Sequence, residues 1–149
     1  MFINETIFAH TARSPLSGVV YVKPCDRTDY TRVLSVCYKR MASRINRDDA
    51  IAACRNDHAR IAEPIGIGQL IALREWSGVD CTDVSELIWI GYDNPTGEEM
   101  YFLNGTKVPF PVLKDWAPKE AQHCMTVAQD CNADTDCVNL KPYMCEITL

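Results

Sequence analysis

The sequence has no long apolar run and no concentration of positive charge. No segment approaches the roughly eighteen consecutive apolar residues that a membrane span requires, and residues 1–20 lack the charged start and apolar centre of a secretory signal. The 15 Lys and Arg are scattered through 149 residues of net charge −5, so no basic stripe is available to follow a phosphate backbone. These absences predict a chain without a membrane span and without a nucleic-acid partner.

The sequence also lacks the usual signatures of an enzyme or of a zinc site. Its histidines, His10, His58 and His123, have no spacing typical of metal ligands, and no Gly-x-Ser-x-Gly sequence is present. No two cysteines lie as close together as in Cys-x-x-Cys, the spacing that a zinc site favours. We therefore expect no catalytic activity, and zinc is the weaker interpretation of the cysteines.

Cysteine itself is abundant. The eight cysteines are Cys25, Cys37, Cys54, Cys81, Cys124, Cys131, Cys137 and Cys145. An even number at this density favours disulfides, which form in oxidising compartments. Two sequons, at Asn4 and Asn104, agree with this interpretation and are candidate glycosylation sites. The composition thus predicts a secreted or extracellular protein.

The length and the 47% apolar content suit a single domain. Residues 1–24 show neither helical nor strand periodicity and predict an N-terminal arm that could add an edge strand, followed by a domain over residues 25–149. Residues 25–38 fit two short strands with a polar turn, and pairing of Cys25 with Cys37 would close them.

Two helices are expected next. The first begins at Asn46, which precedes two aspartates and apolar residues at helical spacing. The second starts after Pro64 and stops at Ser77-Gly78.

The second half predicts strands, because its apolar runs are short and separated by turn residues. These runs cover residues 87–91, 100–103, 124–127 and 142–145. Asn104-Gly105 predicts a hairpin with a type I′ turn. Four aromatic residues on these elements are expected in the core, namely Trp76, Trp89, Phe102 and Tyr143.

Several of these segments resemble C-type lectin-like domains. The matching features are Trp89-Ile90-Gly91, the closing run Pro142-Tyr143-Met144-Cys145-Glu146, the turn Trp116-Ala117-Pro118, and four cysteines in the order of that family, Cys54, Cys124, Cys137 and Cys145. The resemblance covers residues 25–149. It implies an α+β fold in which two helices flank a twisted antiparallel sheet with a long irregular loop lobe, here residues 93–136.

The resemblance also implies a disulfide pattern. It pairs Cys54 with Cys145 and Cys124 with Cys137, and Cys25–Cys37 corresponds to the N-terminal hairpin of long-form members. Cys81 and Cys131 are then left to pair. This additional bridge would either hold the long loop in place or simply stabilise the fold.

In sugar-binding members of this family, calcium is held by two triplets of oxygen-bearing residues. The first corresponds here to Glu120-Ala121-Gln122, which lacks the usual cis-proline, and the second to Asn132-Ala133-Asp134, which keeps only its aspartate. The candidate metal ligands are Glu120, Gln122 and Asp134, with Lys119 placed where it would oppose a cation. A solvated acidic loop is the favoured interpretation, so we expect no bound cofactor.

The segment Lys107–Leu113 carries apolar residues between prolines and should form an extended loop. It would serve as a plug over the core or as an exposed contact through Phe110. Trp116 is expected mainly to pack. The predicted ligand-binding residues are Phe110, Trp116, Lys119, Glu120, Gln122 and Asp134.

The sequence therefore predicts a calcium-independent recognition module that binds an extracellular protein or glycoconjugate through the loop lobe. One alternative is a divergent calcium-dependent carbohydrate-binding lectin. Another is a structural or interaction domain of a larger extracellular protein, including ice-binding or matrix roles.

Overall fold

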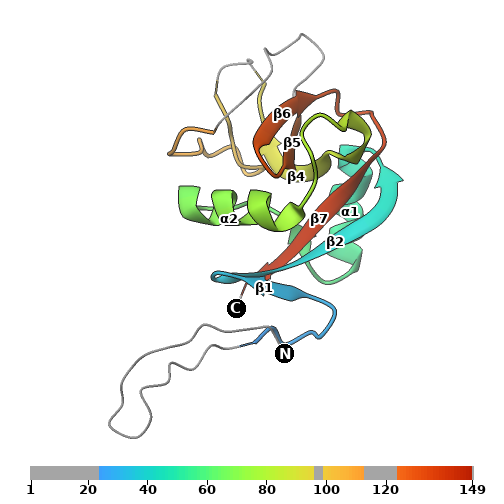
Figure 1. The fold of residues 1–149 in the computed structure, drawn as a ribbon, viewed down its shortest axis with the longest axis vertical. Coiled ribbons are helices and arrows are strands. Elements are labelled where there is room, and N and C mark those ends of the chain that lie inside the picture. Colours follow the sequence, from blue (N-terminus) through green and yellow to red (C-terminus); the bar gives the residue numbers. More distant parts are fainter. Residues whose placement is uncertain (1–23, 96–98, 113–123, 149) are drawn as a thin grey trace, which may run out of the picture.

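In the part of the chain that the structure describes, seven strands form one sheet and two helices pack against it (Figure 1). The computed structural model describes residues 24–95, 99–112 and 124–148. The N-terminal arm predicted over residues 1–24 lies outside this range except for Pro24, and it stays a prediction. The strands are β1 (Thr31–Val33), β2 (Val36–Ile45), β3 (Arg60–Ile61), β4 (Ile88–Asp93), β5 (Cys124–Ala128), β6 (Cys131–Thr135) and β7 (Lys141–Thr148), and the helices are α1 (Arg47–Asn56), α2 (Ile67–Ser77) and the short 3-10 helix η1 (Val84–Glu86).

The sheet is mixed. Its strand order is β1-β2-β7-β4-β5-β6, and β3 pairs with β7. β4 and β7 run parallel and pair at Trp89 and Tyr143, whereas the other pairings are antiparallel. The sheet is antiparallel as expected except at this junction, because the β5-β6 hairpin lies between the two strands in sequence and returns the chain to the same direction.

Both predicted helices are present. Asn46 caps α1, and its side-chain oxygen accepts the Asp49 N–H at 2.8 Å. α2 ends at Gly78, which has a positive φ of 65°. Trp76 was wrongly expected in the core: it is 37% exposed, because Leu70 and Leu73 occupy the inward face of α2. Its ring lies 6.3 Å from that of Tyr38.

The remaining predicted core aromatics differ in burial. Trp89 is fully buried and Tyr143 nearly so, while Phe102 is half-buried. Residues 100–103 do not form a strand; only Tyr101 bridges to Asp93 and to Lys107. β6 was not predicted, because its residues Asn132 and Asp134 are polar although the strand is buried.

The Asn104-Gly105 hairpin exists, but its turn is not type I′. Gly105 has φ of 89° and donates its N–H to Phe102 O at 2.9 Å, and Phe102 N–H donates to Thr106 O at 2.8 Å. Among the described non-glycine residues only Leu34 and His58 have positive φ, so Asn104 does not adopt the conformation that type I′ requires. The loop is instead a three-residue connection with glycine at the left-handed position.

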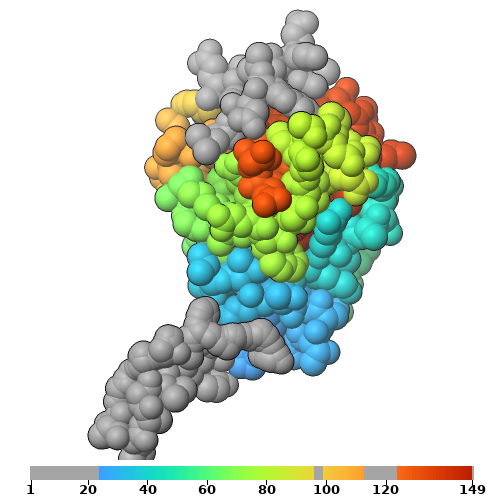
Figure 2. All heavy atoms as spheres, in the orientation of Figure 1, coloured from blue at the N-terminus to red at the C-terminus, as the bar shows by residue number. Residues whose placement is uncertain are grey.

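Four disulfides link the described residues: Cys25–Cys37, Cys54–Cys145, Cys81–Cys131 and Cys124–Cys137. These are the same pairs that the family resemblance implies together with the remaining two cysteines. The Cys81–Cys131 bridge holds the β5-β6 turn against the segment after α2, where Gln129 N–H also donates to Val79 O at 2.7 Å. Figure 2 shows this turn in orange-red, surrounded by the yellow-green residues of that segment.

Within the described part of the chain, no helix has the length and apolar character needed to cross a membrane.

Candidate recognition surface of the loop lobe

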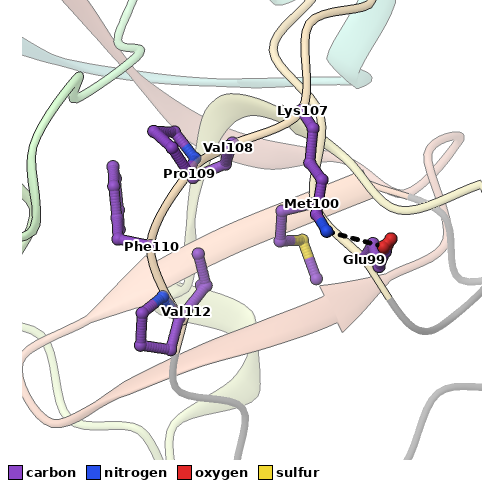
Figure 3. Close-up of a pocket in the computed structure, with 8 residues that line it drawn as sticks. Glu99, Met100, Lys107, Val108, Pro109, Phe110 and Val112 are labelled. Carbon is purple, nitrogen blue, oxygen red and sulfur yellow. Dashed lines mark ion pairs between the residues drawn. The ribbon is translucent and has the colours of Figure 1, made fainter.

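The loop lobe contains a pocket of about 450 Å³ (Figure 3). It is lined by Glu99, Met100, Lys107, Val108, Pro109, Phe110, Pro111 and Val112. All of these residues belong to the hairpin around Asn104 or to the extended segment that follows it. The volume falls within the range of small-ligand sites.

The hairpin is fixed to the end of β4. Asp93 and Tyr101 exchange two backbone hydrogen bonds of 2.8 Å, and the rings of Tyr92 and Phe102 meet edge-on with centroids 5.7 Å apart. Within the hairpin, Val108 N–H donates to Met100 O at 2.9 Å. The pocket therefore rests on the sheet rather than on a free loop.

The floor and the rim of the pocket differ in burial. Met100 and Val108 are buried, and Phe110 and Val112 are half-buried and pack against the main core cluster. Pro109 and Pro111 are exposed. Phe110 therefore packs on the core, as expected of a plug, and also lines the pocket. Its role as a contact for a partner stays a prediction.

One ion pair stands at the rim. Lys107 Nζ lies 3.0 Å from Glu99 Oε2, and the two side chains are 60% and 40% exposed. The hydrogen bond to Glu99 raises the pKa of Lys107. Because both groups are in water, the pair contributes little to stability and its members can exchange partners.

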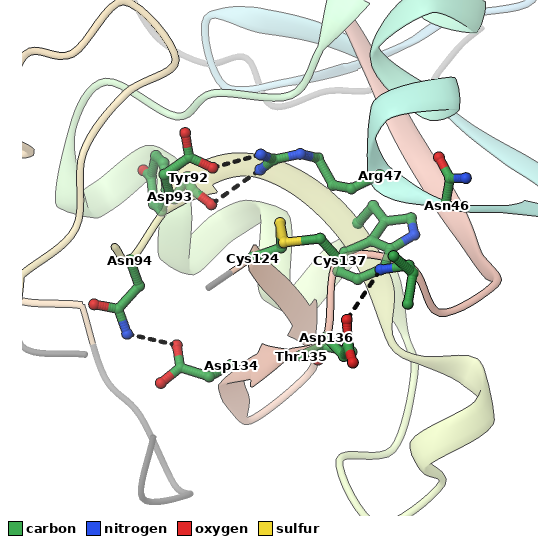
Figure 4. Close-up of a disulfide and its surroundings, with 12 residues drawn as sticks. Asn46, Arg47, Tyr92, Asp93, Asn94, Cys124, Asp134, Thr135, Asp136 and Cys137 are labelled. Atoms are coloured by element: carbon green, nitrogen blue, oxygen red, sulfur yellow. Dashed lines mark hydrogen bonds and ion pairs between the residues drawn. A yellow bond between two sulfur atoms is a disulfide. The ribbon is translucent and has the colours of Figure 1, made fainter. Parts of the chain in front are cut away.

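The ends of β4 and β6 meet beside the Cys124–Cys137 disulfide (Figure 4). There the Asn94 side-chain amide donates to Asp134 Oδ1 at 2.9 Å, and both residues are fully buried. Arg47, also buried, donates to the Asp93 carboxylate and to Tyr92 O. Asp93 is therefore held by α1 on one side while its backbone holds the hairpin on the other.

The predicted site residues are only partly described. Phe110 lines the pocket, and Asp134 is buried and bonded to Asn94 rather than presented at the surface. Trp116, Lys119, Glu120 and Gln122 lie outside the described residues, so most of the predicted calcium ligands stay predictions. Of the two sequons, Asn104 is exposed at the hairpin turn and Asn4 lies outside the described range.

One group of described residues has the spacing of a metal site, namely Cys81, Asp130 and Cys131. Both sulfurs belong to one disulfide, so neither can act as a thiolate ligand. All described cysteines are in disulfides, which also leaves none of them as a catalytic thiol.

Sequence reasoning missed Glu99 and Asn94. Glu99 stands two residues before the Tyr101 bridge, and Asn94 directly follows the last residue of β4. A polar residue at the end of a buried strand is a signal that would have identified Asn94, whereas Glu99 is distinguished only by the fold of the hairpin.

No known family model matches the sequence, and no curated protein matches it either. Solved structures do match. A calcium-independent type II antifreeze protein is 17% identical, with a TM-score of 0.66 over 87% of this chain and 98% of that one. The mouse scavenger receptor C-type lectin carbohydrate-recognition domain is 16% identical, with a TM-score of 0.68 over 82% and 97%.

A third structure, of SPL-1 in complex with GlcNAc, is 19% identical, with a TM-score of 0.66 over 83% of this chain and 96% of that one. The likeness extends over nearly the whole length of each of these three proteins. Together with the two helices, the mixed sheet and the four disulfides, it shows that this chain has the C-type lectin-like fold.

Proposed function

We propose that this protein is an extracellular recognition module that binds a protein or a glycoconjugate through the loop lobe without calcium. The pocket around Phe110 is the observation that carries the proposal. A concave, mainly apolar site with a few polar groups is the usual form of a binding site. It lies in loops that the sheet holds in place, and binding residues tend to concentrate on such loops.

Two observations support independence from calcium. The triplet Glu120-Ala121-Gln122 lacks the proline whose cis bond would align two ligand oxygens. Asp134, the residue retained from the second triplet, is buried and accepts a hydrogen bond from Asn94. The likeness to a calcium-independent type II antifreeze protein is further support for the proposal.

The extracellular location is supported by four disulfides, which persist in oxidising compartments. The same fold in an antifreeze protein and in a receptor's carbohydrate-recognition domain supports a binding role over a catalytic one. A place in a larger extracellular protein is compatible with this proposal.

A calcium-dependent lectin is the second candidate, favoured by the retained Asp134 and by the solved complex of SPL-1 with GlcNAc. Thermal unfolding of the oxidised domain with calcium and with chelator separates the two. A ligand of the native state raises the melting temperature, so the proposal predicts equal melting temperatures. A rise with calcium that Asp134→Asn abolishes would favour the lectin instead.

Binding itself is tested with the oxidised domain on a glycan array and against defined extracellular proteins, in chelator. Phe110→Ala should remove whatever binding is found. Ile71→Ala, at an exposed apolar residue of α2 outside the lobe, is the matched control and should retain it. Melting temperatures of both variants establish that each is folded. Full binding by folded Phe110→Ala would refute the proposal.

A further inference from the structure

The negative charge of the protein is concentrated in the loop lobe. Residues 93–136 contain eight of the 20 acidic residues and three of the 15 basic ones, a formal charge of −5. The whole chain also has a net charge of −5, so the other residues balance. A net charge of one sign attracts partners of the opposite sign and speeds their association.

The segment beside the pocket offers few hydrogen-bond donors. Pro109 and Pro111 have no N–H, and the Val108 N–H is already bonded to Met100 O. The Lys107 ammonium is paired with Glu99. A carboxylate or a phosphate could take Lys107 from Glu99 as readily as a cation could take Glu99 from Lys107, and the net negative charge of residues 93–136 then favours the cation.

The walls of the pocket are apolar, and Glu99 is the acidic group at its rim. The Glu99 side chain is 40% exposed, and its bond to Lys107 is an exposed ion pair. Another cation can therefore compete with Lys107 for it at small cost. An apolar cavity next to an exchangeable carboxylate suits a ligand with an apolar group beside a positive charge.

We infer that the pocket receives an apolar side chain of a polypeptide ligand, with a neighbouring lysine or arginine of that ligand contacting Glu99. This inference rests on the proposed function and specifies its partner as a cationic polypeptide. Arg and Lys supply only donors, which matches the shortage of donors at the pocket. A neutral glycan gains nothing from the charge of the lobe.

The test uses the oxidised domain in chelator and an array of synthetic peptides that carry a central Leu, Met or Phe flanked by Arg or Lys, by Gln, or by Glu. Peptides flanked by Arg or Lys should bind, and their affinity should fall as ionic strength rises. Peptides flanked by Glu should not bind. If no Arg- or Lys-flanked peptide binds, or if Glu-flanked peptides bind equally well, the inference is overturned.

Substitutions at Glu99 and at Lys107 should change the affinity for cationic peptides in opposite directions. Glu99→Gln should weaken the affinity for the cationic peptides roughly twofold to fivefold, and Lys107→Gln should strengthen it by a similar factor, because exposed ion pairs have energies of this order. Both side chains are exposed, so neither variant endangers the fold. The controls are Asp29→Asn and Lys39→Gln, a similar exposed ion pair of 3.1 Å outside the lobe, which should leave affinity unchanged.

These experiments distinguish failure of the cationic-ligand inference from failure of the proposed recognition function. Equal affinities for Glu99→Gln and Lys107→Gln would overturn the cationic ligand, even where Phe110→Ala still abolishes binding and the recognition module stands. Binding of a neutral glycan that Phe110→Ala removes would assign the pocket to a glycoconjugate. Binding that survives Phe110→Ala overturns both.

Discussion

The Glu63 carboxylate accepts a hydrogen bond from Leu103 N–H at 2.8 Å, which joins the segment before α2 to the hairpin that carries the pocket. The Glu63 N–H in turn donates to Glu146 Oε1 at 2.8 Å, on the closing strand β7. Glu146 is also bound by Arg60. The hairpin is thus anchored to the centre of the sheet through a side chain as well as through β4.

Gly91 provides the space for this connection. A Cβ atom at Gly91 would lie 2.5 Å from Glu63 Cγ and 3.1 Å from Ile61 Cγ2. We predict that Gly91→Ala lowers the free energy of unfolding by about 1–3 kcal/mol, as overpacking does, measured by urea denaturation. Gly68→Ala is the control, because a Cβ there meets nothing within 4 Å and alanine favours helix α2 by about 1 kcal/mol. Equal effects of the two substitutions would contradict this account.

Removing the Glu63 acceptor should loosen the hairpin locally. In Glu63→Ala the Leu103 amide loses its partner, and we expect its hydrogen exchange to become about threefold to tenfold faster, since such a bond contributes about 1 kcal/mol. Glu63→Gln retains an acceptor oxygen and should leave the rate near that of the native protein. The Tyr101 amide, bonded to Asp93 O, is the internal reference. Unchanged exchange at Leu103 in Glu63→Ala would show that β4 alone holds the hairpin.

The sequence predicted the helix ends, because these depend on residues that are close together in the chain. Asn46 and Gly78 define helix ends because capping involves residues within a few positions. β6 escaped prediction because its burial results from its pairing with β5 and from the packing of Cys131 and Ala133 in the main core cluster, which outweigh the polarity of its other residues. Propensity is a weak guide where tertiary contacts decide.

The candidate site also combines features that the local sequence predicts with contacts that depend on the fold. The prolines of the segment after Lys107 predicted an extended loop, and Phe110 stood out as its apolar residue. The ion pair of Glu99 with Lys107 depends on the hairpin turn, which places residues eight positions apart side by side. The contact between Glu63 and Leu103 spans 40 positions, and no local pattern encodes it.

The disulfides should contribute unequally to stability. In the chain-entropy description, a bridge stabilises by restricting the unfolded chain, and the effect grows with the loop it closes. Cys81–Cys131 spans 50 residues and Cys25–Cys37 spans 12. Replacing the first pair with serine should cost about 4 kcal/mol and replacing the second about 3 kcal/mol, measured by urea denaturation of both double variants.

These two bridges also differ in what they hold. Loss of Cys81–Cys131 frees the β5-β6 turn from the segment after α2, so peptide or glycan binding by that variant distinguishes the two roles considered for the bridge. Retained affinity in a folded variant assigns it to stability alone. Weaker affinity would show that it orders the loop lobe.

Glu146 should make stability depend on pH. Burial raises its pKa above the ordinary value of 4.5, although the Glu63 N–H and Arg60 act in the opposite direction. The native state therefore keeps a proton in a pH range where the unfolded chain has lost it. By linkage, the contribution of this group is fully present below pH 4.5 and is lost as pH rises through the native pKa, by at most about 1.4 kcal/mol per pH unit.

Glu146→Gln has no proton to lose, and any change in its contacts with Arg60 is a constant offset. The free energy of unfolding of the native protein minus that of the variant should therefore fall as pH rises from 4.5. Urea denaturation across this range measures the difference, with Glu75→Gln, an exposed residue of α2, as the control. A difference that stays constant or increases with pH would mean that Arg60 and the Glu63 N–H outweigh burial, and that Glu146 stabilises the fold as a carboxylate.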